Sequence, residues 1–170
     1  MPRPAMDLHP DDEAARHEHR DRIVRLRYDA GWSSGYLARH LGLVRETVTS
    51  FETYPSANSE ISRYDRHAAP FGFRTYLETE GLDGYGETPY SAVMDAAGDI
   101  GAAEVARLHA YRLHAGLARL DVARLLGVHP SVLLKLEEHR SPPKLASVQR
   151  LARILGGRLA ITLIPLEEEL

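Results

Sequence analysis

Two stretches of this 170-residue chain share one pattern, and that pattern decides the fold. Residues 116–128 read GLARLDVARLLGV, and residues 31–43 read GWSSGYLARHLGL. The match lies at an offset of 85 residues and continues to Phe51-Glu52 in the first copy and Leu136-Glu137 in the second. A repeat at a fixed offset indicates that one structural unit occurs twice.

Each copy predicts two short helices joined by a tight turn. The apolar residues of the first copy keep a helical period on both sides of one break: Leu37, Ala38 and Leu41, then Val48 and Phe51. Gly42 and its equivalent Gly127 stand at the break, where glycine takes the left-handed conformation that ends a helix. Ser33 is a suitable cap for the first helix. Two helices around such a turn make a helix-turn-helix.

Further elements are expected around both pairs. Helices over residues 14–28 and 102–114 should precede them, with inward residues Ile23, Leu26, Ala30, Val105, Leu108, Tyr111 and Leu113. A helix over residues 143–156 follows the second pair, and residues 159–164 then alternate as a strand. The first copy has a weaker echo, with a helix around Tyr64 and a strand over residues 73–78.

The predicted fold class is mainly α, with two tandem helical domains that each end in a short strand. We place the first domain at residues 11–80 and the second at 101–166. Residues 81–100 form the linker, since residues 80–89 are rich in Gly, Pro and Asp.

The composition excludes several classes of protein. A hydrophobic fraction of 44% and a charged fraction of 26% are typical of a globular chain. No apolar run reaches the about 18 to 20 residues that a membrane span needs, and residues 1–18 lack a signal-peptide core, so we expect a cytoplasmic protein. The chain has no cysteine, which excludes disulfides and thiolate zinc sites.

The charge is unevenly distributed along the chain. The net charge is −3, but residues 105–158 hold ten basic and three acidic residues, a local balance of +7. Acidic residues gather instead in the leader and in residues 167–169. A basic segment of this kind favours an anionic partner.

The residues of both copies resemble the lambda-repressor-like (Cro/repressor, or XRE) helix-turn-helix family. The likeness rests on residues 31–52 and, more closely, on residues 116–137 with Ser141-Pro142 and the following helix. It departs from the family at Val44, Ala118 and His129, which stand where polar caps are usual. The resemblance implies that the second helix of each pair enters the DNA major groove.

The resemblance also implies which residues contact DNA. The base-reading positions are Arg45, Glu46, Thr49 and Ser50 in the first copy and Pro130, Ser131, Leu134 and Lys135 in the second. Arg can pair with guanine and Glu with cytosine, each contributing about 1 to 3 kcal/mol of discrimination. The candidate phosphate contacts are Ser34, Arg119, Arg140 and Lys144. The plainer alternative is that these are solvated surface residues, with Leu134 in the core or an interface.

We find no pattern that predicts catalysis, a cofactor or a metal site. His17 and His19 point to different helix faces, and His109 and His114 are five residues apart, so neither pair chelates well. No glycine-rich phosphate loop follows a strand, and no nucleophile elbow is present. We therefore expect a binding protein and not an enzyme.

Three functional hypotheses follow. The first is a sequence-specific double-stranded DNA-binding repressor of transcription, of phage-immunity or plasmid type, that reads an asymmetric bipartite site as a monomer or as a homodimer. The second is an antitoxin-like protein whose C-terminal strand binds a partner protein while the helix-turn-helix autoregulates its operon. The third is structural: the strands over residues 73–78 and 159–164 pair with each other or with a second subunit.

Overall fold

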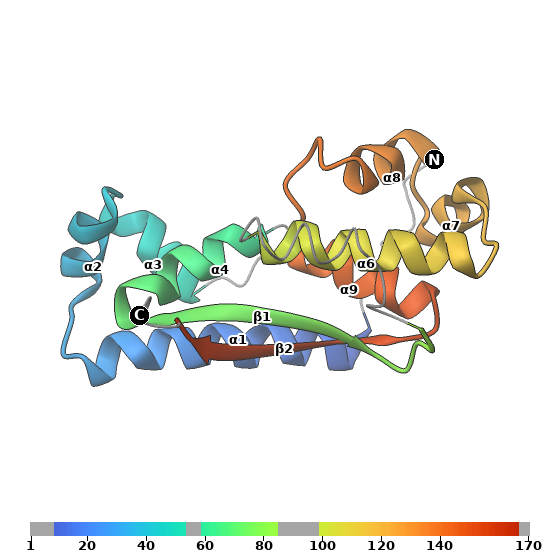
Figure 1. The fold of residues 1–170 in the computed structure, drawn as a ribbon. Coiled ribbons are helices and arrows are strands. Elements are labelled where there is room, and N and C mark those ends of the chain that lie inside the picture. Colours follow the sequence, from blue (N-terminus) through green and yellow to red (C-terminus); the bar gives the residue numbers. More distant parts are fainter. Residues whose placement is uncertain (1–8, 54–58, 85–98, 167–170) are drawn as a thin grey trace.

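The computed structural model describes residues 9–53, 59–84 and 99–166, and the predicted linker at 81–100 lies mostly outside them. The first half comprises α1 (Pro10–Asp29), α2 (Ser34–Leu41), α3 (Arg45–Thr53), α4 (Ile61–Ala68), the 3-10 helix η1 (Ala69–Phe71) and β1 (Phe73–Glu80). The second half comprises α6 (Ile100–His114), α7 (Arg119–Leu126), α8 (Pro130–Glu137), α9 (Leu145–Ile154) and β2 (Arg158–Pro165). The described part of the chain is therefore mainly helical, with one two-stranded sheet (Figure 1).

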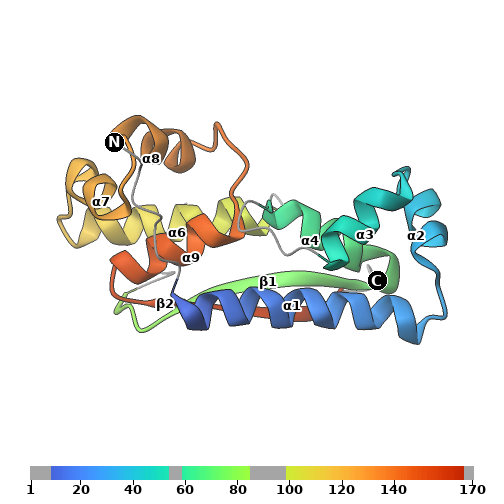
Figure 2. The same ribbon diagram turned by 180° about the vertical axis from the view of Figure 1, so that it is seen from behind.

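The 85-residue repeat of the sequence is also a repeat of structure. The helices α2 and α7, the helices α3 and α8, and the strands β1 and β2 each begin at positions 85 residues apart. The pairs α2–α3 and α7–α8 lie at opposite ends of an elongated molecule, as the two opposed views show (Figures 1 and 2). Both strands expected from the sequence are present, each longer than predicted.

The two strands pair with each other. β1 and β2 are antiparallel, in a register that runs from Phe73 opposite Pro165 to Glu80 opposite Arg158. The register is centred on the pairs Tyr76–Thr162 and Leu77–Ile161, and these two pairs are each other's equivalents in the repeat. The contact therefore has the symmetry that two identical strands would have around a twofold axis.

Helices from both halves cover this sheet. α1 packs on β2 and α6 packs on β1, so each long helix contacts the strand of the other half. The halves meet again where α4 and α9 begin, because Glu60 and Lys144 form an antiparallel bridge. Its two hydrogen bonds run from Leu145 N–H to the Ser59 carbonyl and from Ile61 N–H to the Pro143 carbonyl, each 3.1 Å long.

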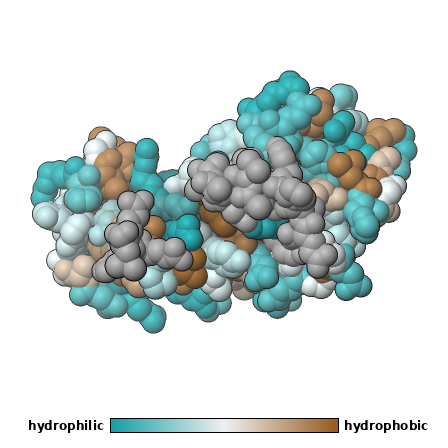
Figure 3. Space-filling model, in the orientation of Figure 1, coloured by the Kyte–Doolittle hydropathy of each residue, from teal (hydrophilic) through white to brown (hydrophobic). Residues whose placement is uncertain are grey.

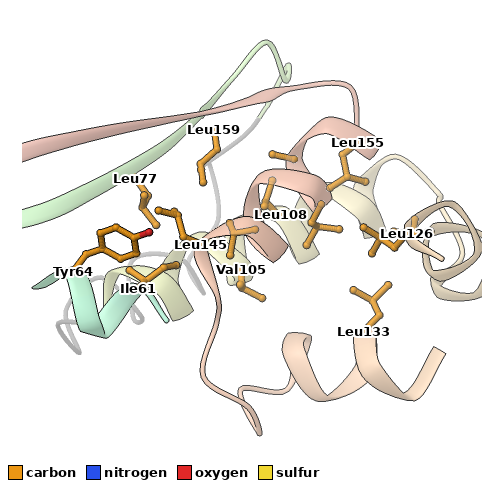
Figure 4. Close-up of a cluster of buried hydrophobic side chains, with 14 of the residues drawn as sticks. Ile61, Tyr64, Leu77, Val105, Leu108, Leu126, Leu133, Leu145, Leu155 and Leu159 are labelled. Atoms are coloured by element: carbon orange, nitrogen blue, oxygen red, sulfur yellow. The ribbon is translucent and has the colours of Figure 1, made fainter. Parts of the chain in front are cut away.

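The main hydrophobic core is continuous across the two halves. It runs from Tyr64 and Ile61 at one end to Leu126 and Leu133 at the other (Figure 4). A smaller cluster of Leu37, Ala38 and Val48, with Trp32 packed against it, lies inside the first helix pair. The assignment of residues 11–80 and 101–166 to two separate domains stays a prediction.

The predicted core is largely confirmed, with two corrections. Ile23, Val105 and Leu108 are buried as expected. Ala30 and Leu113 are exposed instead, Leu113 by 60%. Ala30 is the C-terminal cap of α1, and Leu113 lies in the last turn of α6 next to Arg112, whose side chain takes the buried face.

Candidate nucleic-acid interface

Each helix pair is built around a left-handed glycine. Gly42 follows α2 and Gly127 follows α7, both with φ of 67°, and each N–H donates to carbonyls of the preceding helix. The glycine predictions are thus confirmed. Such a turn ends one helix and lets the chain enter the next at a steep angle.

The capping of these helices follows the sequence in part. The Ser33 hydroxyl accepts the Tyr36 N–H at 3.0 Å, as predicted. Ala118 offers α7 no side-chain cap, in line with its departure from the family pattern. At His129, however, ring Nδ1 accepts the Ser131 N–H at 3.2 Å and caps α8. A histidine therefore takes the role that we expected only of a smaller polar residue.

An ion pair ties each second helix to the long helix before it, partly buried in the first half and fully buried in the second. In the first half Arg27 donates to both carboxylate oxygens of Glu52, at 2.6 and 2.7 Å. In the second half Arg112 donates to both oxygens of Glu137, at 2.6 and 3.0 Å. Each guanidinium also donates to the backbone carbonyl five residues later, at 2.7 Å in both halves. These pairs fix the last turns of α3 and α8.

These ion pairs were not predicted from the sequence. Glu52 and Glu137 match each other in the repeat, but that match alone assigns them no structural role. Arg27 and Arg112 lie 85 residues apart, like the glutamates, so extending the repeat search upstream would have found an arginine 25 residues before each glutamate. Buried glutamates need such a partner, because an unpaired buried charge is strongly destabilising.

The predicted base-reading residues of the first pair share one exposed surface. Arg45, Glu46, Thr49 and Ser50 are all exposed on the first two turns of α3. Opposite them Val48 and Phe51 are buried and anchor the helix. The leading turn of α3 therefore faces solvent, as contact with a DNA groove requires.

The second pair presents a different surface. Ser131 and Lys135 are exposed on α8, whereas Pro130 and Leu134 are half-buried. Pro130 is at the first position of the helix, where its missing N–H leaves no hydrogen bond unmade. Lys135 is thus the one formal charge among the four predicted base-reading residues of α8.

The predicted phosphate contacts lie near the helix starts. Ser34 begins α2, and its hydroxyl accepts a hydrogen bond of 3.3 Å from Arg45 Nε, which brings two predicted DNA-binding residues together. Arg119 is its repeat equivalent at the start of α7 and donates to Glu137 at 3.0 Å. Lys144 is exposed just before α9. Arg140, in the loop between α8 and α9, pairs with Glu138.

Ion pairs reduce the positive surface that the sequence suggested. Of the ten basic residues in the +7 segment, Arg112 is buried against Glu137. Arg153 pairs at 2.9 Å with Asp12 of α1, an acid that lies outside the segment. Part of the local charge excess therefore stabilises the fold, and the exposed cations that remain are the ones available to a polyanion.

No group of three or more His, Asp or Glu side chains among the described residues could hold a metal ion. In the same part of the chain, no helix is both long and apolar enough to cross a membrane.

The α7–α8 pair lies in the part of the chain that matches a known family. Residues 108–161 match the helix-turn-helix family model. The matched segment runs from within α6 through α7, α8 and α9 to the middle of β2, and the first helix pair lies outside it. The second pair is therefore a helix-turn-helix of the kind that DNA-binding regulators of transcription use.

The curated relatives that match are similar over part of their length. Two proteins named Antitoxin HigA1, from Mycobacterium tuberculosis strains CDC 1551 / Oshkosh and ATCC 25618 / H37Rv, are each 36% identical over 87 residues. The match covers 48% of this chain and 58% of each relative. No solved structure matches the chain.

Proposed function

We propose that this protein is a sequence-specific double-stranded DNA-binding repressor of transcription that reads a bipartite site with two helix-turn-helix units. The observation that carries the proposal is the exposure of the leading turns of α3 and α8, two helices whose last turns are held by equivalent arginine–glutamate pairs. A phage-immunity or plasmid setting is the one that the sequence resemblance suggests. The HTH family match at residues 108–161 and the name of the relatives favour binding over catalysis.

In this proposal the α2–α3 pair is a DNA-reading unit in addition to the α7–α8 pair, and we call the two units the reading heads. The α2–α3 pair lies outside the family match, so its role is argued from geometry. Its two helices start at the same offset as α7 and α8, its glycine has the same φ, and its ion pair has the same partners. A duplicated unit with the same supports and an equally exposed leading turn can be used in the same way.

The strand register supports one arrangement of the two heads. An eight-residue strand spans about 27 Å, and the helix pairs lie toward the two ends of the strand pair (Figure 1). The length of the strand pair alone is of the same order as the about 34 Å that divides half-sites one DNA turn apart. Because the register is centred on a pseudo-twofold axis, the half-sites should be inverted relative to one another. One chain would then span both.

The two half-sites should differ in sequence. On α3, Arg45 can donate two hydrogen bonds to guanine and Glu46 can accept one from cytosine. On α8 the exposed candidates are Ser131 and Lys135, which follow a proline at the start of the helix. We therefore expect α3 to contribute more of the base selectivity and the second unit more of the phosphate affinity.

Selection from a randomised duplex library, followed by footprinting, tests this proposal. The expected winner is a site with two unlike, inverted halves about one turn apart, bound by one chain. Two identical halves would overturn the model of two different heads. Absence of any enriched duplex would overturn DNA reading altogether.

Arg45→Ala tests the base-reading role of α3. Its expected effect is a loss of about 1 to 3 kcal/mol of discrimination at one base pair, with a smaller loss of affinity for random duplex. Arg74→Ala, an exposed arginine on β1, is the matched control and should leave both affinities unchanged. Equal losses on specific and random duplex would mean that Arg45 contacts phosphate instead.

Lys144→Ala tests the phosphate role of the loop before α9. Removing one phosphate contact should reduce the slope of log K against log salt by about one unit. Binding titrations at several salt concentrations measure it. An unchanged slope would remove Lys144 from the interface.

An antitoxin-like role is the second candidate, since both curated relatives are named as antitoxins. Among the described residues the sheet has two strands, so β2 keeps one edge with which a partner's strand could pair. A small toxin-like reading frame beside the gene, whose product forms a complex with this chain in sizing experiments, would favour this role. Absence of a complex would leave DNA binding as the function.

A further inference from the structure

The second helix-turn-helix unit holds an apolar cavity that the DNA-binding proposal does not use. Its volume is about 400 Å³, within the range typical of small-molecule sites. It opens between α7, α8 and α9, and its hydrophobic walls come from the following residues: Leu126, Val128, Val132, Leu133 and Leu136. Leu126 and Leu133 are also the end of the continuous core, so the cavity floor is rigidly packed (Figure 4).

The equivalent hollow in the first unit is polar and partly filled. It is lined by Leu43, Thr47, Arg63, Arg66 and His67, among others. The repeat equivalent of Val132 there is Thr47. Because α4 begins 84 residues before α9, Arg63 is the equivalent of Ser147, which lines the cavity of the second unit. Arg63 donates to the Thr47 carbonyl at 3.3 Å and lies 5.5 Å from the centre of the Phe51 ring. A long arginine side chain thus occupies the place where the second unit has only a serine.

The rim of the cavity in the second unit carries more positive than negative charge. Lys144 and Arg150 line it, with Glu60 as the opposing acid and the hydroxyls of Ser141 and Ser147 beside them. Arg150 donates to the Leu126 carbonyl, and burial lowers the pKa of its guanidinium. A partly desolvated guanidinium interacts more strongly with an incoming anion than a fully hydrated one does.

Hydrophobic surface also gathers at this end of the molecule. Exposed apolar side chains of the second half include Leu120, Leu125 and Val132, the last of which is 52% exposed although it lines the cavity. Figure 3 shows brown patches among hydrophilic residues over the α7–α8 end. A half-exposed valine at a cavity mouth leaves apolar area that a ligand can bury.

We propose that this cavity binds a small amphipathic anion, an apolar body with one carboxylate or sulfonate group. The apolar body would contact the walls that α7 and α8 provide, and the anionic group would lie between Lys144 and Arg150. Val132 and Leu136 belong to the reading helix, and Lys144 is a candidate phosphate contact. Where the proposed DNA function holds, ligand and DNA would therefore oppose each other's binding by the same factor.

Calorimetric titration of the full chain with octanoate tests the cavity, with octylammonium as the probe of similar chain length and opposite charge. We expect saturable one-to-one binding of octanoate and at least tenfold weaker binding of octylammonium. Val132→Trp should fill the cavity and lower the affinity for octanoate at least tenfold. Thr47→Trp, at the equivalent position of the first unit, should leave the affinity unchanged.

A second variant keeps the test decisive if Val132→Trp disturbs α8. Lys144→Glu changes an exposed rim residue and should weaken the binding of octanoate while strengthening the binding of octylammonium. Absence of saturable binding, equal binding of both probes, or equal effects of the two tryptophan variants would overturn the cavity proposal. None of these results bears on duplex binding. Octanoate that binds without changing DNA affinity would refute only the coupling.

Discussion

His19 makes the stability of this protein depend on pH in a way that can be calculated. The side chain is 1% exposed, with Nε2 at 2.9 Å from the Thr75 hydroxyl and its ring against Tyr64. Burial, and secondarily the nearby charge of Arg22, lower the pKa of His19 from 6.5 to about 4. The folded protein therefore keeps His19 neutral at pH values where the unfolded chain protonates it.

The sign and the size follow from proton linkage. Because the unfolded state binds more protons between pH 6.5 and about 4, the stabilisation is fully present above pH 6.5 and decreases as the pH falls. Each pKa unit corresponds to about 1.36 kcal/mol. Neutral burial of His19 alone should therefore lower the free energy of unfolding by about 2.5 kcal/mol between pH 7.5 and about pH 4.5. His67, whose pKa burial also lowers, acts in the same direction.

Urea unfolding of the wild type and His19→Gln at these two pH values isolates the effect. Carboxylates titrate in the same range, so the informative quantity is the difference between the two proteins in their pH-dependent loss of stability. We expect the glutamine variant to lose about 2.5 kcal/mol less. His17→Gln, half-exposed on the same helix, is the control. Equal changes in the two variants would refute burial as the cause.

Further substitutions test the ion pair and the closest backbone approach. Glu137→Gln should lower the free energy of unfolding by about 3 to 5 kcal/mol in urea titrations, because it leaves a buried arginine partly unpaired. The same change at Glu138, an exposed neighbour, should cost less than about 1 kcal/mol, and equal effects would contradict the argument. Gly157→Ala would place Cβ 2.7 Å from the Glu80 carbonyl oxygen and should lower the free energy of unfolding by about 1 to 3 kcal/mol. Gly35→Ala, whose added Cβ would come no closer than 3.9 Å to the Ser33 hydroxyl, should not destabilise.

Local features of the fold could be predicted because they depend on neighbouring residues. The left-handed turns at Gly42 and Gly127 follow from glycine's backbone freedom and the break in the apolar period. The strand at β2 follows from a change to twofold alternation before Pro165. The Ser33 cap follows from its place before α2.

Long-range features could not be predicted in the same way. Alternation identifies a strand but not its partner, so pairing of β1 with β2 was one of several open alternatives. The charge count could not show that Arg153 meets Asp12, which is 141 residues away in the sequence. Burial of Glu137 likewise depends on where α6 lies. The roles of Arg45, Lys144 and the other predicted DNA-binding residues stay predictions.

The symmetric strand register has an evolutionary and a quantitative consequence. In a homodimer every substitution appears on both sides, and dilution separates the subunits. Here the two strands belong to one polypeptide, so their pairing does not depend on protein concentration. Each half can also mutate independently, as Thr47 and Val132 illustrate, so one gene can hold two surfaces that no longer need to be alike.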